Sequence, residues 1–201
     1  MQVACLDLEG VLVPEIWIAF SEKTGIGELR LTTREVPDYD VLMKRRIGIL
    51  EERGLALGDI QDVIGSMDPL PGAGDFLESL RSKVQVIILS DTFTQFAQPL
   101  MRKLRWPTLF CNTLEIDDRN MITGFRLRQR EGKKHAVAAL RSINMRVAAA
   151  GDSYNDILMI QEADSGTLFR APDSIKTQFP SIPTAETYAE LETRLLEGLF
   201  P

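Results

Sequence analysis

Residues 1–13 read MQVACLDLEGVLV, an apolar run interrupted by the carboxylates of Asp7 and Glu9. The apolar residues 3–6 predict a short strand, because a strand covered on both faces is apolar at consecutive positions. Similar runs occur at 84–89, 108–111 and 146–150, with a weaker one at 166–169. We therefore predict a parallel β-sheet whose first strand lies at the start of this sequence.

Amphipathic stretches between these runs predict helices. Apolar residues recur at three- and four-residue spacing in 75–81, 93–104, 134–143 and 154–163, and a closing helix is expected at 187–199. Alternating strands and helices are typical of an α/β fold with a doubly wound, Rossmann-like parallel sheet and right-handed crossovers. A β-hairpin is expected where residues 113–116 and 122–128 flank the turn-rich sequence DDRN.

Residues 14–71 break this alternation directly after the first strand. Helical spacing of apolar residues occurs there at 16–23, 38–53 and 57–65. We expect a core made of residues 1–13 and 72–201, with residues 14–71 forming a small helical cap. A cap in this position can act as a lid over the end of the first strand.

Composition narrows the classes of partner. The 201 residues carry a formal net charge of −6, which argues against nucleic acid or an anionic membrane as a general ligand. No apolar run approaches the roughly 18 residues of a membrane-spanning helix, so we expect no membrane partner. Cys5 and Cys111 lie in apolar stretches and are typical of free thiols in a reducing compartment, which predicts a cytoplasmic protein. The sequence leaves the oligomeric state open, a homodimer included.

Polar residues follow three of the predicted strands. Ligands of an open parallel sheet bind at the carboxyl ends of its strands, so we expect these side chains to meet at one edge. They are Asp7 and Glu9, then Ser90, Asp91 and Thr92, then Asp152, Asn155 and Asp156. Lys133 or Lys134, at the start of the preceding helix, can join them. Cations are disfavoured in a first helical turn, so such a lysine needs an anionic partner, unless it is simply solvated.

The acidic residues permit two kinds of chemistry. Asp7 and Glu9 come just before a glycine, which allows the chain to turn sharply. One of the two carboxylates can then attack as a nucleophile while the other transfers a proton. The alternative is two solvated loop acids. Asp152 and Asp156 have a spacing that can hold a hard cation such as Mg²⁺. Ser153 and Asp156 equally fit a capping box, which leaves Asp152 unexplained.

Two further segments offer binding groups. The spacing of Thr92 and Gln95 predicts the capped start of a helix. The free backbone N–H groups of that helix start would point at Ser90, as a phosphate-binding site requires. The alternative is an ordinary turn between a strand and a helix. In the insertion, an arginine of the run 44–46 can clamp a carboxylate and Glu15 can hold an ammonium group. The alternative for this charge run is a solvated helix face.

Four motifs together carry a resemblance. DLEGV at 7–11, LSDT at 89–92, GKK at 132–134 and GDSYND at 151–156 resemble, in order and placement, those of the haloacid dehalogenase-like phosphatases. Within that superfamily the chain resembles the phosphoserine phosphatases. Its first twenty residues are most similar to the bifunctional phosphoserine phosphatase/phosphoserine:homoserine phosphotransferases.

The resemblance implies a Mg²⁺-dependent hydrolysis of phosphoserine through an aspartyl phosphate, with transfer of the phosphoryl group to homoserine as a second activity. It implies that Asp7 is the nucleophile and that Glu9 is the general acid and base. It also implies the remaining assignments. Ser90 binds the phosphoryl group and Lys133 neutralises Asp7 and the phosphate, Glu15 and Arg46 bind the ammonium and carboxylate, and Asp7, Glu9, Asp152 and Asp156 form the metal site. Asp91, Thr92 and Asn155 are further candidates for substrate binding.

The chain departs from the family pattern at two positions, since most members carry Asp at Glu9 and many carry Gly or Thr at Asp91. The preference for Lys133 over Lys134 rests on the apolar spacing of the following helix.

Two alternatives stay open: a phosphatase of another small phosphate monoester, and a non-catalytic domain that switches state when Asp7 is phosphorylated. Glu9 and the long insertion favour an enzyme, because a switch needs neither a proton-transfer group nor a lid.

Overall fold

The computed structural model describes residues 1–32, 35–36 and 38–201. Its sheet has the strand order β4-β3-β2-β1-β5-β6-β7, and neighbouring strands are parallel except for the antiparallel pair β3–β4. The strands are β1 (Gln2–Leu6), β2 (Gln85–Phe93), β3 (Thr108–Ile116), β4 (Ile122–Arg126), β5 (Arg146–Gly151), β6 (Ser165–Phe169) and β7 (Thr184–Ala185). The central position of β1 and the parallel order confirm the predicted doubly wound α/β fold.

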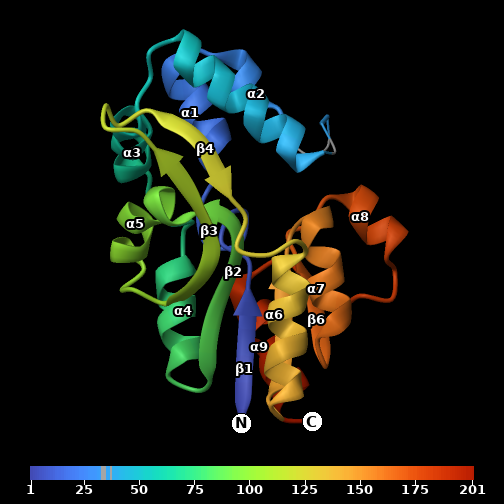
Figure 1. The fold of residues 1–201 in the computed structure, drawn as a ribbon. Helices are drawn as coiled ribbons and strands as arrows, with labels where there is room; N and C mark the ends of the chain where they lie inside the picture. The colour runs from blue at the N-terminus through green and yellow to red at the C-terminus, as the bar shows by residue number, and fades with distance from the viewer. Residues whose placement is uncertain (33–34, 37) are drawn as a thin grey trace.

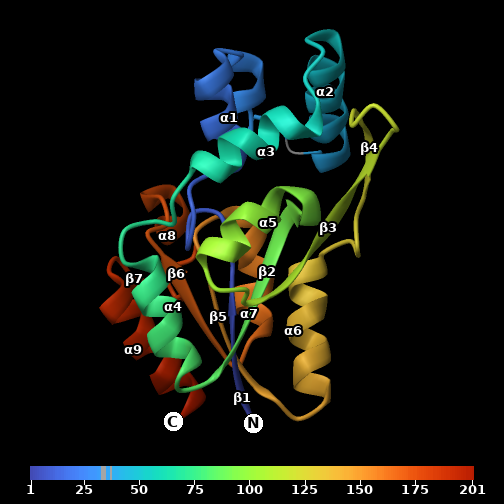
Figure 2. The same cartoon turned by 90° about the vertical axis from the view of Figure 1, so that its left-hand side faces the viewer.

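Helices cover both faces of the sheet (Figures 1 and 2). One face is covered by α4 (Ala73–Arg81), α5 (Thr94–Lys103) and α9 (Tyr188–Leu199), and the other by α6 (Gly132–Ser142) and α7 (Ile157–Glu162). Along β1, Ala4 and Leu6 pack into the first layer, whereas Val3 and Cys5 pack into the second. Alternate side chains of a strand point to opposite faces, so the continuous apolar run in β1 reflects burial on both sides.

The insertion forms a helical group above the carboxyl ends of the strands (Figure 1). It contains α1 (Ile16–Thr24), the 3-10 helix η1 (Gly27–Arg30), α2 (Tyr39–Glu52) and α3 (Leu57–Ser66). The end of the predicted β3–β4 hairpin reaches up beside it, and the N–H of Leu57 donates to the carbonyl of Asn120 at 2.9 Å. This hydrogen bond joins the insertion to the turn between β3 and β4.

The predicted end of the second strand and the predicted cap of the helix after it are wrong. β2 continues to Phe93, so α5 begins at Thr94 and Thr92 does not cap it. The side chain of Gln95 instead bonds the backbone N–H and carbonyl of Leu114, both at 3.0 Å. The cause is an irregularity in β2 that re-pairs Phe93 with Asn112 of β3, a tertiary contact absent from local sequence.

The remaining differences concern short elements. The predicted helix at 154–163 is split into a 3-10 turn, η2 (Tyr154–Asp156), and α7. Strand β7 and helix α8 (Asp173–Gln178) were not predicted, because two- and six-residue segments show no clear period. In the described parts of the chain, none of the helices combines the length and apolar character that crossing a bilayer requires.

Candidate active site

Asp7 leaves β1 at the centre of the sheet. Its N–H donates to the carbonyl of Ala150 in β5 at 3.0 Å, and its Oδ1 accepts from the N–H of Leu8 at 2.7 Å. Three residues later the chain turns at Gly10, where φ is +78° and a Cβ atom would lie 2.5 Å from the carboxylate of Asp152. Glycine at this position therefore lets the loop after β1 turn and pass directly against Asp152.

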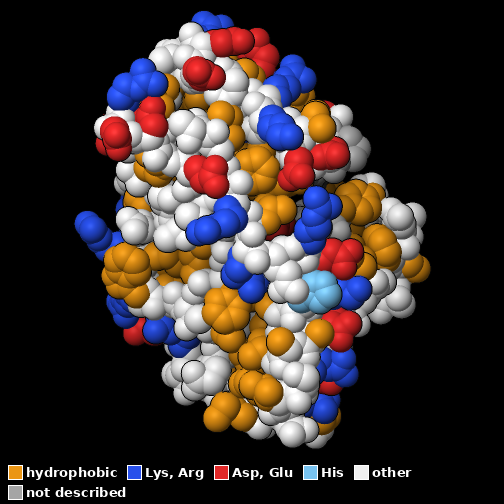
Figure 3. Space-filling view, viewed as in Figure 1, with side chains coloured by type: hydrophobic (Ala, Val, Ile, Leu, Met, Phe, Trp, Pro, Cys, Tyr) orange, Lys and Arg blue, Asp and Glu red, His pale blue; other side chains and the backbone are white. Residues whose placement is uncertain are grey.

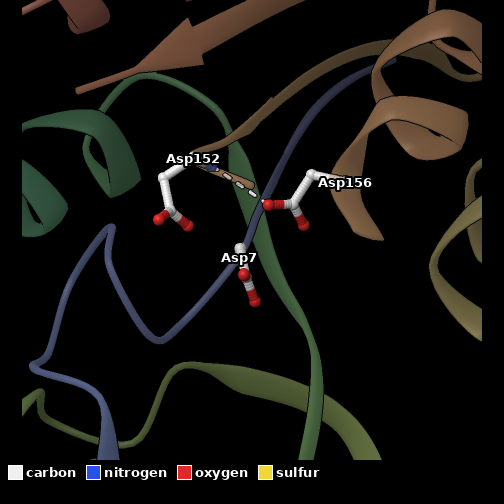
Figure 4. A group of neighbouring side chains, drawn as sticks. All are labelled: Asp7, Asp152 and Asp156. Atoms are coloured by element: carbon white, nitrogen blue, oxygen red, sulfur yellow. Dashed lines mark hydrogen bonds between the residues drawn. The ribbon is translucent and has the colours of Figure 1, made fainter. Parts of the chain in front are cut away.

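Asp7, Asp152 and Asp156, drawn in Figure 4, bring carboxylate oxygens within 4.8 Å of one another. Asp156 is fully buried, and its Oδ2 accepts from the N–H groups of Asp152 at 3.0 Å and Ser153 at 3.1 Å. The predicted capping contact between the Asp156 carboxylate and the backbone of Ser153 is thus present. Asp156 consequently shapes the loop after β5 as well as belonging to the acidic cluster.

Lys133 is the lysine that reaches this cluster. Its side chain is 5% exposed, and its Nζ lies 2.9 Å from Asp7 Oδ1 and 2.7 Å from Asp156 Oδ1. Lys134 points elsewhere and pairs with Glu131 at 3.7 Å. Of the two lysines that the sequence left open, the geometry places Lys133 at the site.

The cluster holds more negative charge than Lys133 balances. Burial and the nearby charge of Asp156 raise the pKa of Asp7 well above its usual value. The same two causes raise the pKa of Asp152 to about 7. One oxygen of Asp152 is also buried without a hydrogen-bond partner. A hard divalent cation bound by oxygen ligands would satisfy that oxygen and offset the repulsion, so these residues fit Mg²⁺.

The end of β2 adds hydroxyl and carboxylate groups. Ser90 and Thr92 are buried, and the N–H of Thr92 donates to Ser90 Oγ at 3.2 Å. Between them, the carboxylate of Asp91 accepts from the side-chain amide of Asn155 at 2.9 Å and lies 3.8 Å from Lys133 Nζ. The hydrogen bond between Asn155 and Asp91 therefore connects the end of β2 to the loop after β5.

Glu9 is half-buried, and its Oε2 accepts from the N–H of Ile16 at 2.8 Å. Burial, followed by the nearby charge of Glu15, raises the pKa of Glu9 to about 8. A carboxyl group with such a pKa is partly protonated near neutrality. It can therefore both donate and accept a proton.

A cavity of about 750 Å³ joins the strand ends to the helical insertion. Predicted site residues that line it are Asp7, Glu9, Glu15, Arg46, Ser90, Asp91, Thr92, Lys133 and Asn155. Asp152 and Asp156 do not line it and lie beside Asp7. Figure 3 shows acidic and basic side chains interleaved where the insertion meets the sheet on this face.

Sequence reasoning missed three residues of this region. Tyr39 and Trp17 line the cavity from the insertion, and the hydroxyl of Tyr39 donates to the carbonyl of Asp91 at 3.0 Å. Buried Asn112 donates to the same carbonyl at 3.0 Å. A polar residue inside an apolar strand was a usable signal for Asn112. Nothing local marks Tyr39 or Trp17, because their roles depend on how the insertion packs.

Comparisons with known proteins agree with this geometry. The chain is 57% identical over 198 residues to the phosphoserine phosphatase ThrH of Pseudomonas aeruginosa, covering 98% of this chain and 97% of that protein. It is 54% identical over 198 residues to a phosphoserine phosphatase of Pseudomonas syringae pv. tomato, covering 98% and 84%. A solved phospho-aspartyl intermediate analogue of phosphoserine phosphatase shares the fold, with a TM-score of 0.75 at 17% identity over 96% of this chain and 97% of that one.

The family assignment rests on a match along most of the sequence. The family model for haloacid dehalogenase-like hydrolases matches residues 1–164, which include all four motifs and the acidic cluster. The predicted resemblance is therefore confirmed. The chain is an enzyme that belongs to the haloacid dehalogenase-like hydrolases.

Proposed function

We propose that this enzyme is a Mg²⁺-dependent phosphoserine phosphatase that works through a phosphorylated Asp7. The observation that carries the proposal is the arrangement of charge along one cavity. Asp7, Lys133 and Ser90 lie at its strand end, whereas Arg46 and Glu15 line it from the insertion. Phosphoserine carries a phosphate, a carboxylate and an ammonium group, which this distribution complements. The Pseudomonas aeruginosa relative, at 57% identity, is a phosphoserine phosphatase.

The first chemical step places Asp7 in line with phosphorus. The carboxylate forms a bond to phosphorus while the bond to the serine oxygen breaks, leaving an aspartyl phosphate. Lys133, 2.9 Å from Asp7, reduces the repulsion between this carboxylate and the phosphate dianion. Mg²⁺ held by Asp7, Asp152 and Asp156 supplies further positive charge when bound. Ser90, which lines the same cavity, would hold phosphoryl oxygens through its hydroxyl group.

Glu9 supplies the proton steps. In its protonated form it donates to the departing serine oxygen. As a carboxylate it then takes a proton from water as the water attacks phosphorus, which restores Asp7 and releases phosphate. The raised pKa of about 8 for Glu9 supports both roles near neutral pH.

Residues 14–71 form the cap in this proposal, with residues 1–13 and 72–201 as the core. Arg46 and Glu15 of the cap hold the carboxylate and ammonium groups of phosphoserine. The hydrogen bond from Tyr39 to the Asp91 carbonyl and the contact of Leu57 with Asn120 support a cap that closes on the core. Closure excludes bulk water from the cavity and strengthens the charged contacts within it.

Transfer to homoserine is a second part of the proposal. Glu9 carries one more methylene than aspartate, so its carboxyl group extends further toward the cavity. That reach favours an alcohol over water as the group from which Glu9 removes a proton. Homoserine has the same ammonium and carboxylate as serine and fits the same cap residues.

The test is product analysis with phosphoserine and Mg²⁺, with and without homoserine. We expect repeated release of serine and phosphate, and phosphohomoserine when homoserine is present. A single turnover that leaves Asp7 phosphorylated would instead support the switch domain. Faster turnover of another monoester in a substrate panel would support a different phosphatase specificity.

A further inference from the structure

Arg46 is a buried cation that forms no direct ion pair with the residues that the structure describes, although the charges of Glu9 and Glu15 act on it from further away. Its side chain is 6% exposed, and its Nε has no hydrogen-bond partner. None of the ion pairs found among residues 1–32, 35–36 and 38–201 includes Arg46. Burial lowers the pKa of Arg46 to about 10, and the nearby carboxylates of Glu9 and Glu15 oppose this shift only in part. An anionic ligand in the cavity would provide the missing compensation.

The Arg46 guanidinium packs against an aromatic face. The Arg46 Cζ lies 4.5 Å from the ring centroid of Trp17, and one terminal nitrogen donates to the carbonyl of Leu31 at 2.7 Å. Trp17 is itself held edge-on by Phe96, at 5.5 Å between centroids, and by Phe20, at 6.4 Å. The ring is thus a rigid platform under a side chain that otherwise has several rotatable bonds.

The face of an aromatic ring orients the Arg46 guanidinium at a lower cost in hydrogen-bonding groups than a protein carboxylate would. A cation–π contact uses the face of the planar guanidinium and leaves the N–H groups along its edge free. A protein carboxylate would occupy those N–H groups and compete with the carboxylate of a ligand. Trp17 therefore stabilises Arg46 in one orientation while leaving its hydrogen-bonding capacity for an occupant of the cavity.

We propose that Trp17 is a positioning residue that, through Arg46, sets the preference of the enzyme for phosphate esters that carry a carboxylate. The inference rests on the proposed function, because it assigns Trp17 to the carboxylate end of the same cavity. Trp17 comes from α1 and Arg46 from α2, so the pair also fixes how two helices of the cap meet.

The experiment compares phosphoserine with p-nitrophenyl phosphate, a monoester without a carboxylate. Cation–π contacts of buried cations contribute enough that Trp17→Leu is expected to raise the KM for phosphoserine about 10-fold, with kcat within about twofold. Both constants for p-nitrophenyl phosphate are expected to stay within about twofold. Trp17→Phe keeps an aromatic face and is expected to recover most of the lost affinity.

Two controls separate positioning from packing. Phe76→Leu removes a ring that packs against Tyr188 elsewhere in the same apolar core, and it is expected to leave the ratio of kcat/KM between the two substrates unchanged. In the double variant Trp17→Leu/Arg46→Ala, the KM for phosphoserine should equal that of Arg46→Ala alone, because Trp17 acts only through Arg46. If Trp17→Leu does not fold, Trp17→Phe carries the test, with a two- to fivefold rise in KM for phosphoserine only.

Equal losses with both substrates, or multiplicative effects in the double variant, would show that Trp17 is merely structural. The wild-type protein tests the proposed function separately. If it hydrolyses p-nitrophenyl phosphate but not phosphoserine, both the function and the assignment of Trp17 are wrong. If it prefers phosphoserine and the Trp17 variants keep that preference, the assignment of Trp17 alone is wrong.

Discussion

The ammonium of Lys133 lies 2.9 Å from Asp7 Oδ1, and both side chains are almost completely buried. The same ammonium lies 2.7 Å from Asp156 Oδ1, so one buried cation separates two buried carboxylates. Burial and the nearby charge of Asp156 raise the pKa of Asp7, while Lys133 opposes that shift. Lys133 therefore favours the carboxylate form of Asp7, which attack on phosphorus requires.

Replacement of Lys133 by methionine tests this relationship. Loss of a preorganised positive group at a reacting centre lowers kcat by about 100- to 1,000-fold, and we expect a decrease in this range with phosphoserine. Lys134→Met is the matched control, since the adjacent lysine is half-exposed and pairs with Glu131. Steady-state kinetics of both variants check the prediction. Similar losses in the two variants would contradict the assignment of Lys133.

Asp152 links the proposed metal site to stability. Its pKa is about 7 in the folded metal-free protein, compared with an ordinary value of 3.8, so the folded state binds this proton more tightly than the unfolded state does. The stabilising contribution of the protonated group is complete below about pH 4 and is lost as the pH rises through 7. Asp152→Asn removes this pH-dependent loss of stability, because asparagine does not ionise. We expect the chelator-treated variant to melt at a higher temperature than the wild type at pH 8.

Mg²⁺ should reverse that order. Addition of the ion is expected to raise the melting temperature of the wild type but not of Asp152→Asn, because the variant lacks one ligand. Asp173→Asn, at a side chain that is 99% exposed, serves as the control and should keep the wild-type response. A metal-free Asp152→Asn protein that melts below the wild type at pH 8 would show that Asp152 is stabilising on its own.

Arg46→Ala tests the carboxylate contact of the cap. Hydrogen bonds to charged groups contribute about 1.5–3 kcal/mol, which corresponds to a rise of about 10- to 150-fold in the KM for phosphoserine. The KM for p-nitrophenyl phosphate should change little. Arg45→Ala, at an exposed position of the same helix, is the control. If the KM rises equally for both substrates, Arg46 does not bind the carboxylate.

Glu9→Asp tests the balance between water and alcohol acceptors. Shortening the side chain withdraws the carboxyl group from the cavity, so we expect the ratio of phosphohomoserine to free phosphate to fall. The measurement is the product ratio at fixed phosphoserine and homoserine concentrations. An unchanged ratio would remove the proposed link between Glu9 and transfer.

The sequence was sufficient for the architecture because the strands of the core are apolar throughout and the helices have one apolar face. The rule that ligands bind at the carboxyl ends of parallel strands then predicted which polar residues would meet. Glu15 was a candidate from its position at the start of the insertion, whereas the choice of Arg46 came through the resemblance, and both line the cavity that Asp7 lines.

What the sequence could not supply depends on tertiary packing. Lys133 and Lys134 are adjacent on α6, and only the way that helix packs decides which of them faces Asp7. The extension of β2 to Phe93 depends on pairing with Asn112, which local propensity does not encode. Trp17 and Arg46 lie on different helices of the insertion, so their contact is visible only in three dimensions.

The central claim is that phosphorus becomes bonded to Asp7 during turnover. Borohydride added while the enzyme turns over phosphoserine with Mg²⁺ reduces an acyl phosphate, and peptide mass spectrometry then locates the altered side chain. We predict that the alteration falls on Asp7 and is absent when phosphoserine is omitted. An unmodified Asp7 in an enzyme that is turning over, or modification at a different carboxylate, would contradict the account.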